Sequence, residues 1–177
     1  HRMNYIKLLH IEGFKKFVSL GVPFNEHMNI LVGENEAGKS TILDALKTVL
    51  NQQYRTADKS VLRDLFNAQM VAEFRANPSV NTLPKIYIEV ELVLDPQEKN
   101  ASYFYGEVYG RRQQQTEKYG IRFECKYDEE LGVGMEQSIL EGKIPYEYYA
   151  LTWTTFANRP YQIIKRPLNF LSIDTTN

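Results

Sequence analysis

Apolar side chains alternate with polar ones along two stretches in the second half of the chain. In residues 86–94 and 121–127 every second position is apolar, and the positions between are mostly polar. This period of two predicts strands with one dry and one solvated face, as in an antiparallel sheet. Residues 96–118 show no clear pattern, and we expect 111–118 to be a solvated loop or a strand end.

Extended structure is also expected near both ends of the chain. Residues 4–12 predict a strand that Gly13 ends, and residues 14–24 predict a second extended segment with a turn at Gly21. Residues 148–165 are rich in aromatic side chains and threonine, which predicts another hairpin.

The hydrophobic period changes within the first half of the chain. Residues 28–32 form a short apolar run before a glycine, which predicts a strand buried on both faces. Apolar residues then recur at helical spacing from Ser40 to about Tyr54, which predicts an amphipathic helix. Residues 58–76 are also expected to be helical, as one helix or two, with Ser60 as an N-cap.

The sequence GENEAGKST, residues 33–41, lies between the predicted strand and helix and has the spacing of a phosphate-binding loop, G-x-x-x-x-G-K-[ST]. A helix N-terminus after such a loop offers unpaired N–H groups and a positive dipole end to an anion. The residues expected to bind ATP are the framing Gly33 and Gly38, Lys39 on the β- and γ-phosphates, Ser40 as the Mg²⁺ ligand and Thr41 on the α-phosphate, with Asn35 and Ala37 completing the loop. The alternative is a glycine-rich turn without a ligand.

Two carboxylates stand inside this loop. If the carboxylate of Glu34 or Glu36 faced the phosphates, the repulsion between the negative charges would be strong in a site shielded from water. Because such a loop binds through backbone N–H groups, we expect both side chains to point away from the nucleotide. Glu36 also requires a backbone that an L-residue tolerates.

Composition narrows the class of protein. The 177 residues suffice for one domain with a core, and a net charge of −1 provides no global basic field for nucleic acid. The single cysteine, Cys125, is expected to be a buried small hydrophobe, and its isolation fits a reducing cytoplasm. No segment predicts a membrane span. His1 and Arg2 are interpreted as the remnant of a tag, which leaves residues 3–177 as the domain.

Two segments carry a resemblance to a known family. YIKLLHIEGFKKF (5–17) and NILVGENEAGKSTILDAL (29–46) resemble the N-terminus of the SMC/RecF-type branch of the ABC ATPases, in which Asn35 is the typical loop residue. IPYEYYALTWTTF (144–156) and PLNFLSIDTT (167–176) resemble the OLD family of ATP-dependent endonucleases, relatives of which serve in anti-phage defence.

The resemblance implies an α/β fold with α+β character. It would be a P-loop NTPase, specifically a partial ABC-type ATPase head with a P-loop strand-helix unit and an antiparallel β subdomain. It implies ATP and Mg²⁺ as cofactors, a full-length homodimer and DNA as its partner. Lys15 matches a basic position that approaches the phosphates in the family, although a solvated turn lysine is an equal alternative.

The rest of such a head is expected to lie outside this chain. Asp95 is followed by Pro96, and Asp174 by Thr175, where a Walker B strand would place a catalytic glutamate. We therefore assign no catalytic residue, and we expect the second lobe and the nuclease domain to be absent. Among the glutamines, none is assigned to the Q-loop of ABC heads; the candidates by residue type are Gln97, Gln137 and Gln162.

Two smaller groups of residues allow two interpretations each. Arg111, Arg112 and Lys118 lie near three tyrosines and form either a DNA-facing patch or an exposed loop beside core tyrosines. The aromatic residues around Trp153 form either an interface or the core of a β subdomain.

These observations favour the ATP-binding lobe of an OLD-family endonuclease, which couples nucleotide binding to DNA processing or phage defence. The alternatives are a DNA-repair ATPase of SMC/RecF type without a nuclease and a degenerate, non-catalytic binding module. A complete small-molecule kinase or GTPase would need an acidic Mg²⁺ partner on a second apolar strand, which the sequence lacks.

Overall fold

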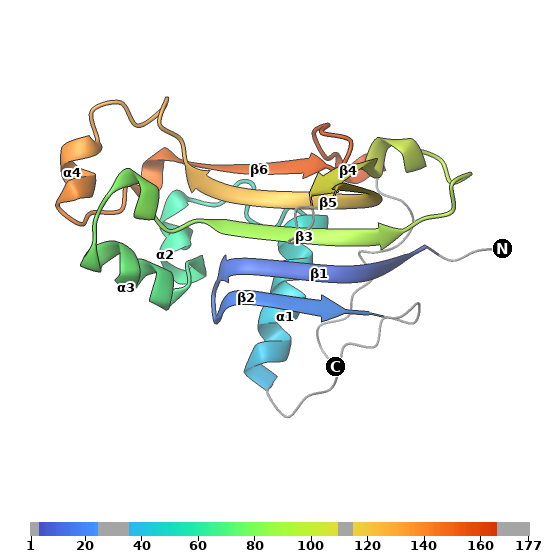
Figure 1. Ribbon diagram of the computed structural model, residues 1–177, viewed down its shortest axis with the longest axis horizontal. Helices are drawn as coiled ribbons and strands as arrows, with labels where there is room; N and C mark the ends of the chain where they lie inside the picture. The colour runs from blue at the N-terminus through green and yellow to red at the C-terminus, as the bar shows by residue number, and fades with distance from the viewer. Residues whose placement is uncertain (1–3, 25–35, 110–114, 166–177) are drawn as a thin grey trace.

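The computed structural model describes residues 4–24, 36–109 and 115–165 (Figure 1). In these residues an antiparallel sheet has the strand order β2-β1-β3-β5-β4, and β6 also pairs with β5. The strands are β1 (Tyr5–Phe14), β2 (Phe17–Pro23), β3 (Ile86–Val93), β4 (Tyr105–Tyr109), β5 (Gln115–Tyr127) and β6 (Tyr149–Thr155).

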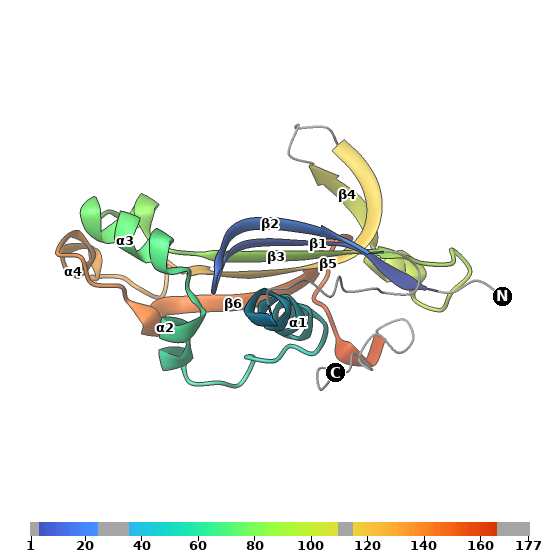
Figure 2. The same ribbon diagram turned by 90° about the horizontal axis from the view of Figure 1, so that it is seen from below.

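Strand β5 pairs with two different strands, β4 and β6, along one edge. Residues 115–119 pair with β4 and residues 121–127 pair with β6. At the junction the Phe156 N–H donates to the Gly120 carbonyl at 3.0 Å. Figure 2 shows β4 and the first part of β5 bending away from the sheet, on the side opposite α1. The change of partner at Gly120 therefore coincides with the bend.

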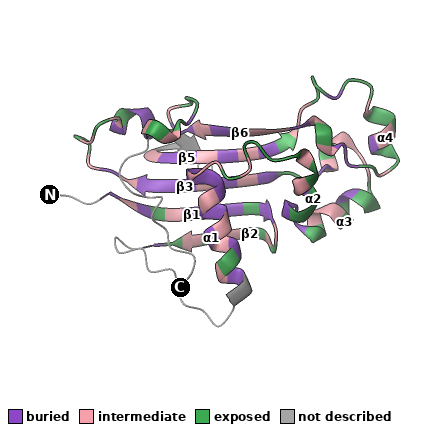
Figure 3. Cartoon of the chain, turned by 180° about the vertical axis from the view of Figure 1, so that it is seen from behind, coloured by how far each residue is buried: buried purple, intermediate pink, exposed green. Residues whose placement is uncertain are grey.

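Helix α1 (Glu36–Leu50) lies across one face of the sheet, as the views from below and behind show (Figures 2 and 3). The other helices gather at one end of the sheet: α2 (Leu62–Leu65), α3 (Ala68–Ala76) and α4 (Glu136–Leu140). Short 3₁₀ turns are at Lys59–Val61, Val80–Thr82, Ala101–Phe104, Tyr146–Tyr148 and Ile163–Lys165.

The strand register explains why α1 packs against this face of the sheet. Ile11, Ile88, Phe123 and Trp153 form one row across β1, β3, β5 and β6, and all four are buried. One residue away, the neighbouring row is polar and consists of His10, Glu89, Arg122 and Thr154. Since successive side chains on a strand point to opposite faces, the alternation read from the sequence becomes a core under α1 and a polar outer face.

The strands predicted at 4–12, 86–94 and 121–127 are confirmed, but Gly13 does not end the first of them, because β1 continues through Gly13 to Phe14. The turn predicted at Gly21 is wrong: Gly21 lies within β2 opposite His10, and the chain reverses at residues 15–16 instead.

Other element boundaries differ from the sequence-based ones. Helix α1 begins at Glu36 and ends at Leu50, several residues earlier at both ends than the helical spacing predicted. Residues 58–76 form two α-helices, because Phe66 and Asn67 are extended between them. The N-cap at the start of this region is Asp58 and not Ser60, since the Asp58 carboxylate accepts the Ser60 N–H.

Around residues 96–165 the sequence pattern was less reliable. Strand β4 was not predicted, because its residues have no clear alternation. The second arm of the late hairpin is a single bridge from Thr154 to Pro160, followed by a 3₁₀ turn, and not a strand. The strand predicted at 28–32 lies outside the described residues, as do residues 167–176.

Candidate functional site

The second half of the predicted phosphate-binding loop forms the first turns of α1. Gly38 and Thr41 are buried there, Lys39 is half-buried and Ser40 is exposed. Ala37 is the second residue of the helix, whereas Gly33 and Asn35 lie outside the described residues. The structure therefore places Gly38, Lys39, Ser40 and Thr41 at a helix N-terminus, where backbone N–H groups and the helix dipole favour an anion.

Glu36 is the first residue of α1. A helical backbone suits any L-residue, so a glycine is not required at this position. This agrees with the expectation that the loop tolerates a glutamate there. The direction of the Glu36 side chain remains a prediction.

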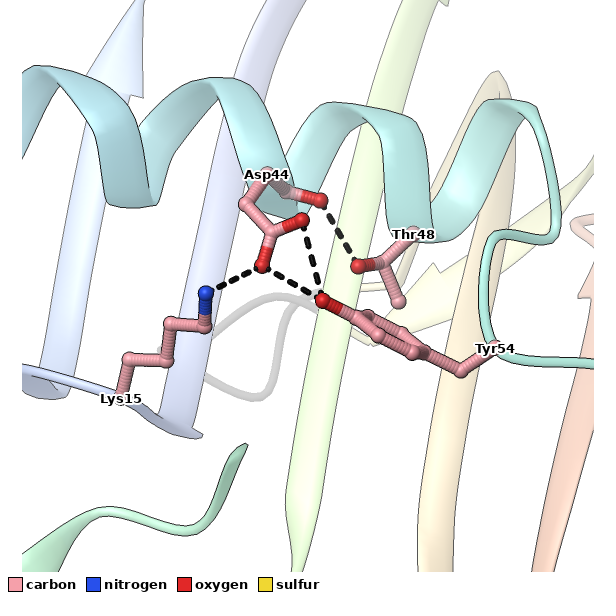
Figure 4. A network of polar contacts seen from close by, with 4 residues as sticks. All are labelled: Lys15, Asp44, Thr48 and Tyr54. Carbon is pink, nitrogen blue, oxygen red and sulfur yellow. Dashed lines mark hydrogen bonds and ion pairs between the residues drawn. The ribbon is translucent and has the colours of Figure 1, made fainter. Parts of the chain in front are cut away.

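The middle of α1 is tied to the β1–β2 turn by an ion pair (Figure 4). The Lys15 Nζ lies 2.6 Å from Oδ2 of Asp44, which is one helical turn beyond Ser40. The Tyr54 hydroxyl contacts the same carboxylate, at 3.1 Å from Oδ1 and 2.9 Å from Oδ2. Burial, reinforced by the Asp44 charge, raises the pKa of Tyr54 far above its usual range, so that its hydroxyl remains a donor.

The backbone of Lys15 is also fixed by neighbouring residues. Lys15 has a φ of +50°, which is uncommon for a residue with a side chain. Its N–H donates to the Leu65 carbonyl at 2.7 Å, and its carbonyl accepts from the Asn67 side-chain amide at 2.9 Å. The Asn67 N–H donates to the Gly13 carbonyl at 3.0 Å, so Asn67 holds both sides of the turn.

The C-terminal end of α1 is capped by two aromatic side chains from the far end of the chain. The last carbonyls of a helix have no partner within it. The Trp153 indole N–H donates to the Thr48 carbonyl and the Tyr161 hydroxyl donates to the Leu50 carbonyl, both at 2.8 Å. Sequence reasoning left Trp153 in either a core or an interface and could not find this role, because more than 100 residues separate each pair.

The other candidates from the sequence do not join this site within the described residues. Asp95 begins a turn in which its carboxylate accepts the Gln97 N–H, which is not a Walker B arrangement. Gln97, Gln137 and Gln162 are exposed, and the Gln137 amide donates to Glu141.

The basic group near the tyrosines is described only in part. Lys118 forms an ion pair with the buried carboxylate of Glu91 at 2.7 Å, while Arg111 and Arg112 lie outside the described residues. Tyr103 is buried as expected for a core tyrosine, but Tyr105 is 40% exposed. Lys118 therefore has an intramolecular partner on the polar face of the sheet.

Two predictions about buried residues are confirmed. Cys125 is fully buried, and burial raises the pKa of its thiol to about 12. Trp153 packs in the core, with its ring centroid 4.9 Å from that of Phe123. No group of three or more metal-ligating His, Cys, Asp or Glu occurs among the described residues. No helix in the described part of the chain is long and apolar enough to cross a membrane.

A helix that carries a Gly-Lys-Ser-Thr sequence in its first turns and packs across an antiparallel sheet is compatible with a nucleotide-binding ATPase domain. Residues 8–169 match the family described as "AAA domain", and the chain belongs to this family.

A curated relative points to the same branch of ATPases. The chain is 34% identical over 61 residues to the "DNA replication and repair protein RecF" of Clostridium acetobutylicum. The match covers 33% of this chain and 17% of that protein, so the chain spans only a small part of its relative. No solved structure matches the chain significantly. The family and the relative together support an ATPase head of SMC/RecF type.

Proposed function

We propose that this chain is the ATP-binding lobe of a DNA-processing ATPase, and that residues 33–41 bind the phosphates of ATP with Mg²⁺. The observation that supports the proposal is that the Gly-Lys-Ser-Thr sequence, residues 38–41, lies in the first turns of α1, which begins at Glu36. Lys39 would neutralise the β- and γ-phosphates, Ser40 would ligate Mg²⁺, and Thr41 would contact the α-phosphate. Gly33, Asn35 and Ala37 would complete the loop.

The finer proposal is that residues 3–177 form the N-terminal lobe of an OLD-family ATP-dependent endonuclease that acts as a homodimer in the cytoplasm. It is supported by the resemblance of residues 144–156 and 167–176 to that family. ATP binding would be coupled to DNA cleavage by a separate domain, for example in phage defence. The lobe alone would lack the carboxylate that positions the attacking water.

A repair ATPase without a nuclease is the second candidate, and the match to a RecF protein favours it. The two candidates differ in DNA cleavage. Full-length protein incubated with ATP, Mg²⁺ or Mn²⁺, and plasmid DNA should produce breaks if the nuclease proposal holds. Intact DNA under conditions of active ATP turnover would favour the repair ATPase.

Substitution of Lys39 tests the nucleotide site itself. In the full-length protein, Lys39→Ala should weaken binding of a fluorescent ATP analogue by roughly tenfold or more, since it removes a charged contact to the phosphates. Glu36→Ala is the matched control in the same loop and should leave the affinity unchanged, because we expect that carboxylate to point away. Unchanged binding and turnover in Lys39→Ala would refute the phosphate-loop assignment, whereas unchanged binding with lost turnover would limit Lys39 to catalysis.

A further inference from the structure

Apolar side chains are exposed around α4, at the end of the sheet where β5 ends (Figure 1). Among the described residues, three of the six most exposed large hydrophobic side chains lie within ten positions of one another: Leu131, Val133 and Leu140. Their exposed fractions are 58%, 81% and 58%. Single exposed hydrophobic residues are ordinary, but a group of them indicates a contact surface. Residues 128–141, which carry this group, are called the α4 surface.

The loop before α4 is fixed by hydrogen bonds. The Tyr127 hydroxyl donates to the Gly132 carbonyl at 2.9 Å, and the Gly132 N–H donates to the Asp128 carbonyl at 3.0 Å. The Met135 N–H also donates to the Gly132 carbonyl, at 3.0 Å. A backbone held in this way presents its apolar side chains in one arrangement, so a partner that covers them loses little affinity to ordering of the loop.

The α4 surface is also strongly acidic. Residues 128–141 contain five carboxylates and no lysine, arginine or histidine, whereas the net charge of the whole chain is only −1. Burial, together with the charges of Glu136, Glu129 and Asp128, raises the pKa of Tyr127 above its usual value, so these carboxylates gather around the loop. A surface with this charge repels the phosphates of nucleic acid and attracts a basic partner.

A pocket of about 320 Å³ adjoins the α4 surface, with which it shares Met135 and Ser138. This volume lies within the range of cavities that take a bound group. Ile144 makes part of its wall apolar, and the carboxylates of Asp58 and Glu147 belong to its lining as well. The pocket therefore combines the two properties of the neighbouring surface, apolar area and negative charge.

The two basic side chains that line the pocket already have partners within the chain. The Arg63 guanidinium lies 4.5 Å from the centre of the Tyr146 ring, and the Lys143 Nζ lies 3.6 Å from Oε1 of Glu141. Lys143 offsets one of the five carboxylates of the α4 surface, which leaves the surface acidic.

The α4 surface offers side chains to a partner rather than a strand edge. Residues 128–141 contain turns and a helix but no strand. The N–H groups of Gly132, Met135 and Ile139 already donate to carbonyls of the same segment. A strand from a partner would find no edge to pair with here. A helix satisfies its own backbone groups and can present apolar side chains on one face with basic side chains beside them.

We propose that the α4 surface and the adjoining pocket bind a basic amphipathic helix of a partner protein. The apolar face of that helix would cover Leu131, Val133 and Leu140, and one of its apolar side chains would enter the pocket. Its lysine or arginine side chains would pair with the surrounding carboxylates. The surface includes no residue of the phosphate-binding loop, so the inference does not depend on ATP binding.

A synthetic peptide tests this with the full-length protein. The peptide has about 18 residues, with leucine on one helical face and lysine on the other, and a control peptide carries glutamate in place of lysine. Fluorescence anisotropy should give a dissociation constant of roughly 1–100 μM for the lysine peptide, weakening as salt is added, and no binding of the glutamate peptide.

Substitutions on the protein locate the binding surface. Val133→Ser combined with Leu140→Ser should weaken binding of the lysine peptide roughly tenfold or more, because both side chains lose apolar area buried by the peptide. Ile164→Ser is the matched control: Ile164 is 88% exposed but lies in the 3₁₀ turn at residues 163–165, and its loss should not change the affinity. All three positions are exposed, so thermal unfolding should show unchanged stability.

The inference is overturned if the lysine peptide does not bind, or if it binds the Val133→Ser, Leu140→Ser variant as tightly as the unsubstituted protein. Equal binding of the glutamate peptide would also overturn it, because the charge of the surface would then not select the partner. Sedimentation velocity supplies the last arm. If the double variant breaks a dimer that Ile164→Ser preserves, a second copy of this chain covers the surface and the proposed partner is wrong.

Discussion

Removal of one oxygen atom from Tyr161 should loosen the end of α1. Tyr161 is 4% exposed, and its hydroxyl donates to the Leu50 carbonyl, one of the last four carbonyls of the helix. Tyr161→Phe keeps the ring but leaves a buried carbonyl without this donor. Such a loss costs about 1–3 kcal/mol of unfolding free energy. For a chain of this size, each kcal/mol lowers the melting temperature by roughly 2–4 °C.

Urea and thermal unfolding followed by circular dichroism measure this difference. Tyr119→Phe is the matched control, because Tyr119 is half-buried against Tyr105 and its hydroxyl makes no hydrogen bond among the described residues. Its unfolding free energy should change by less than about 0.5 kcal/mol. If Tyr161→Phe is no less stable than Tyr119→Phe, the aromatic cap does not stabilise α1 and the reasoning is wrong.

Two further predictions concern the sheet. Gly120→Ala should destabilise the protein strongly or prevent folding, because the added Cβ would lie 2.6 Å from the Val90 carbonyl oxygen, a backbone atom, and closer still to the Phe156 ring. Gly21→Ala, in β2 with nothing within 4 Å of the added Cβ, is the control and should fold normally; equal melting temperatures would contradict the close packing at Gly120. Stability should fall as pH rises from about 9 to about 12, because the unfolded Cys125 thiol ionises in that range while its folded pKa is about 12. Cys125→Ala should reduce this loss in unfolding experiments across the range, and an identical pH profile would contradict it.

Local patterns predicted the parts of the fold that depend on near neighbours in the chain. In β3 and β5 each strand has one buried face, so the side-chain period of two is visible in the sequence alone. The helical spacing after Ser40 likewise revealed α1, although its ends were misplaced. Residues at helix ends pack less regularly, which makes boundaries the weakest part of such a prediction.

The failures occur where distant contacts override a local signal. Gly21 has the residue type of a turn but lies in β2, because pairing with β1 keeps the chain extended through it. Strand β4 has little alternation of its own and is extended because β5 offers it a hydrogen-bonding edge. Residues 163–165 form a 3₁₀ turn rather than the second strand of a hairpin.

The candidate site likewise has a part that the local sequence predicts and a part that depends on distant contacts. The sequence by itself predicted a helix at the Gly-Lys-Ser-Thr motif, whose chemistry depends on local spacing, whereas Lys15 was singled out by the resemblance of residues 5–17 to the SMC/RecF-type ATPases. Only the tertiary structure decided that the Lys15 ammonium meets Asp44 and Tyr54, and that Trp153 and Tyr161 cap the other end of the helix. Hydrogen bonds and ion pairs act over about 3 Å, so residues far apart in sequence become partners only after the sheet and α1 have packed together.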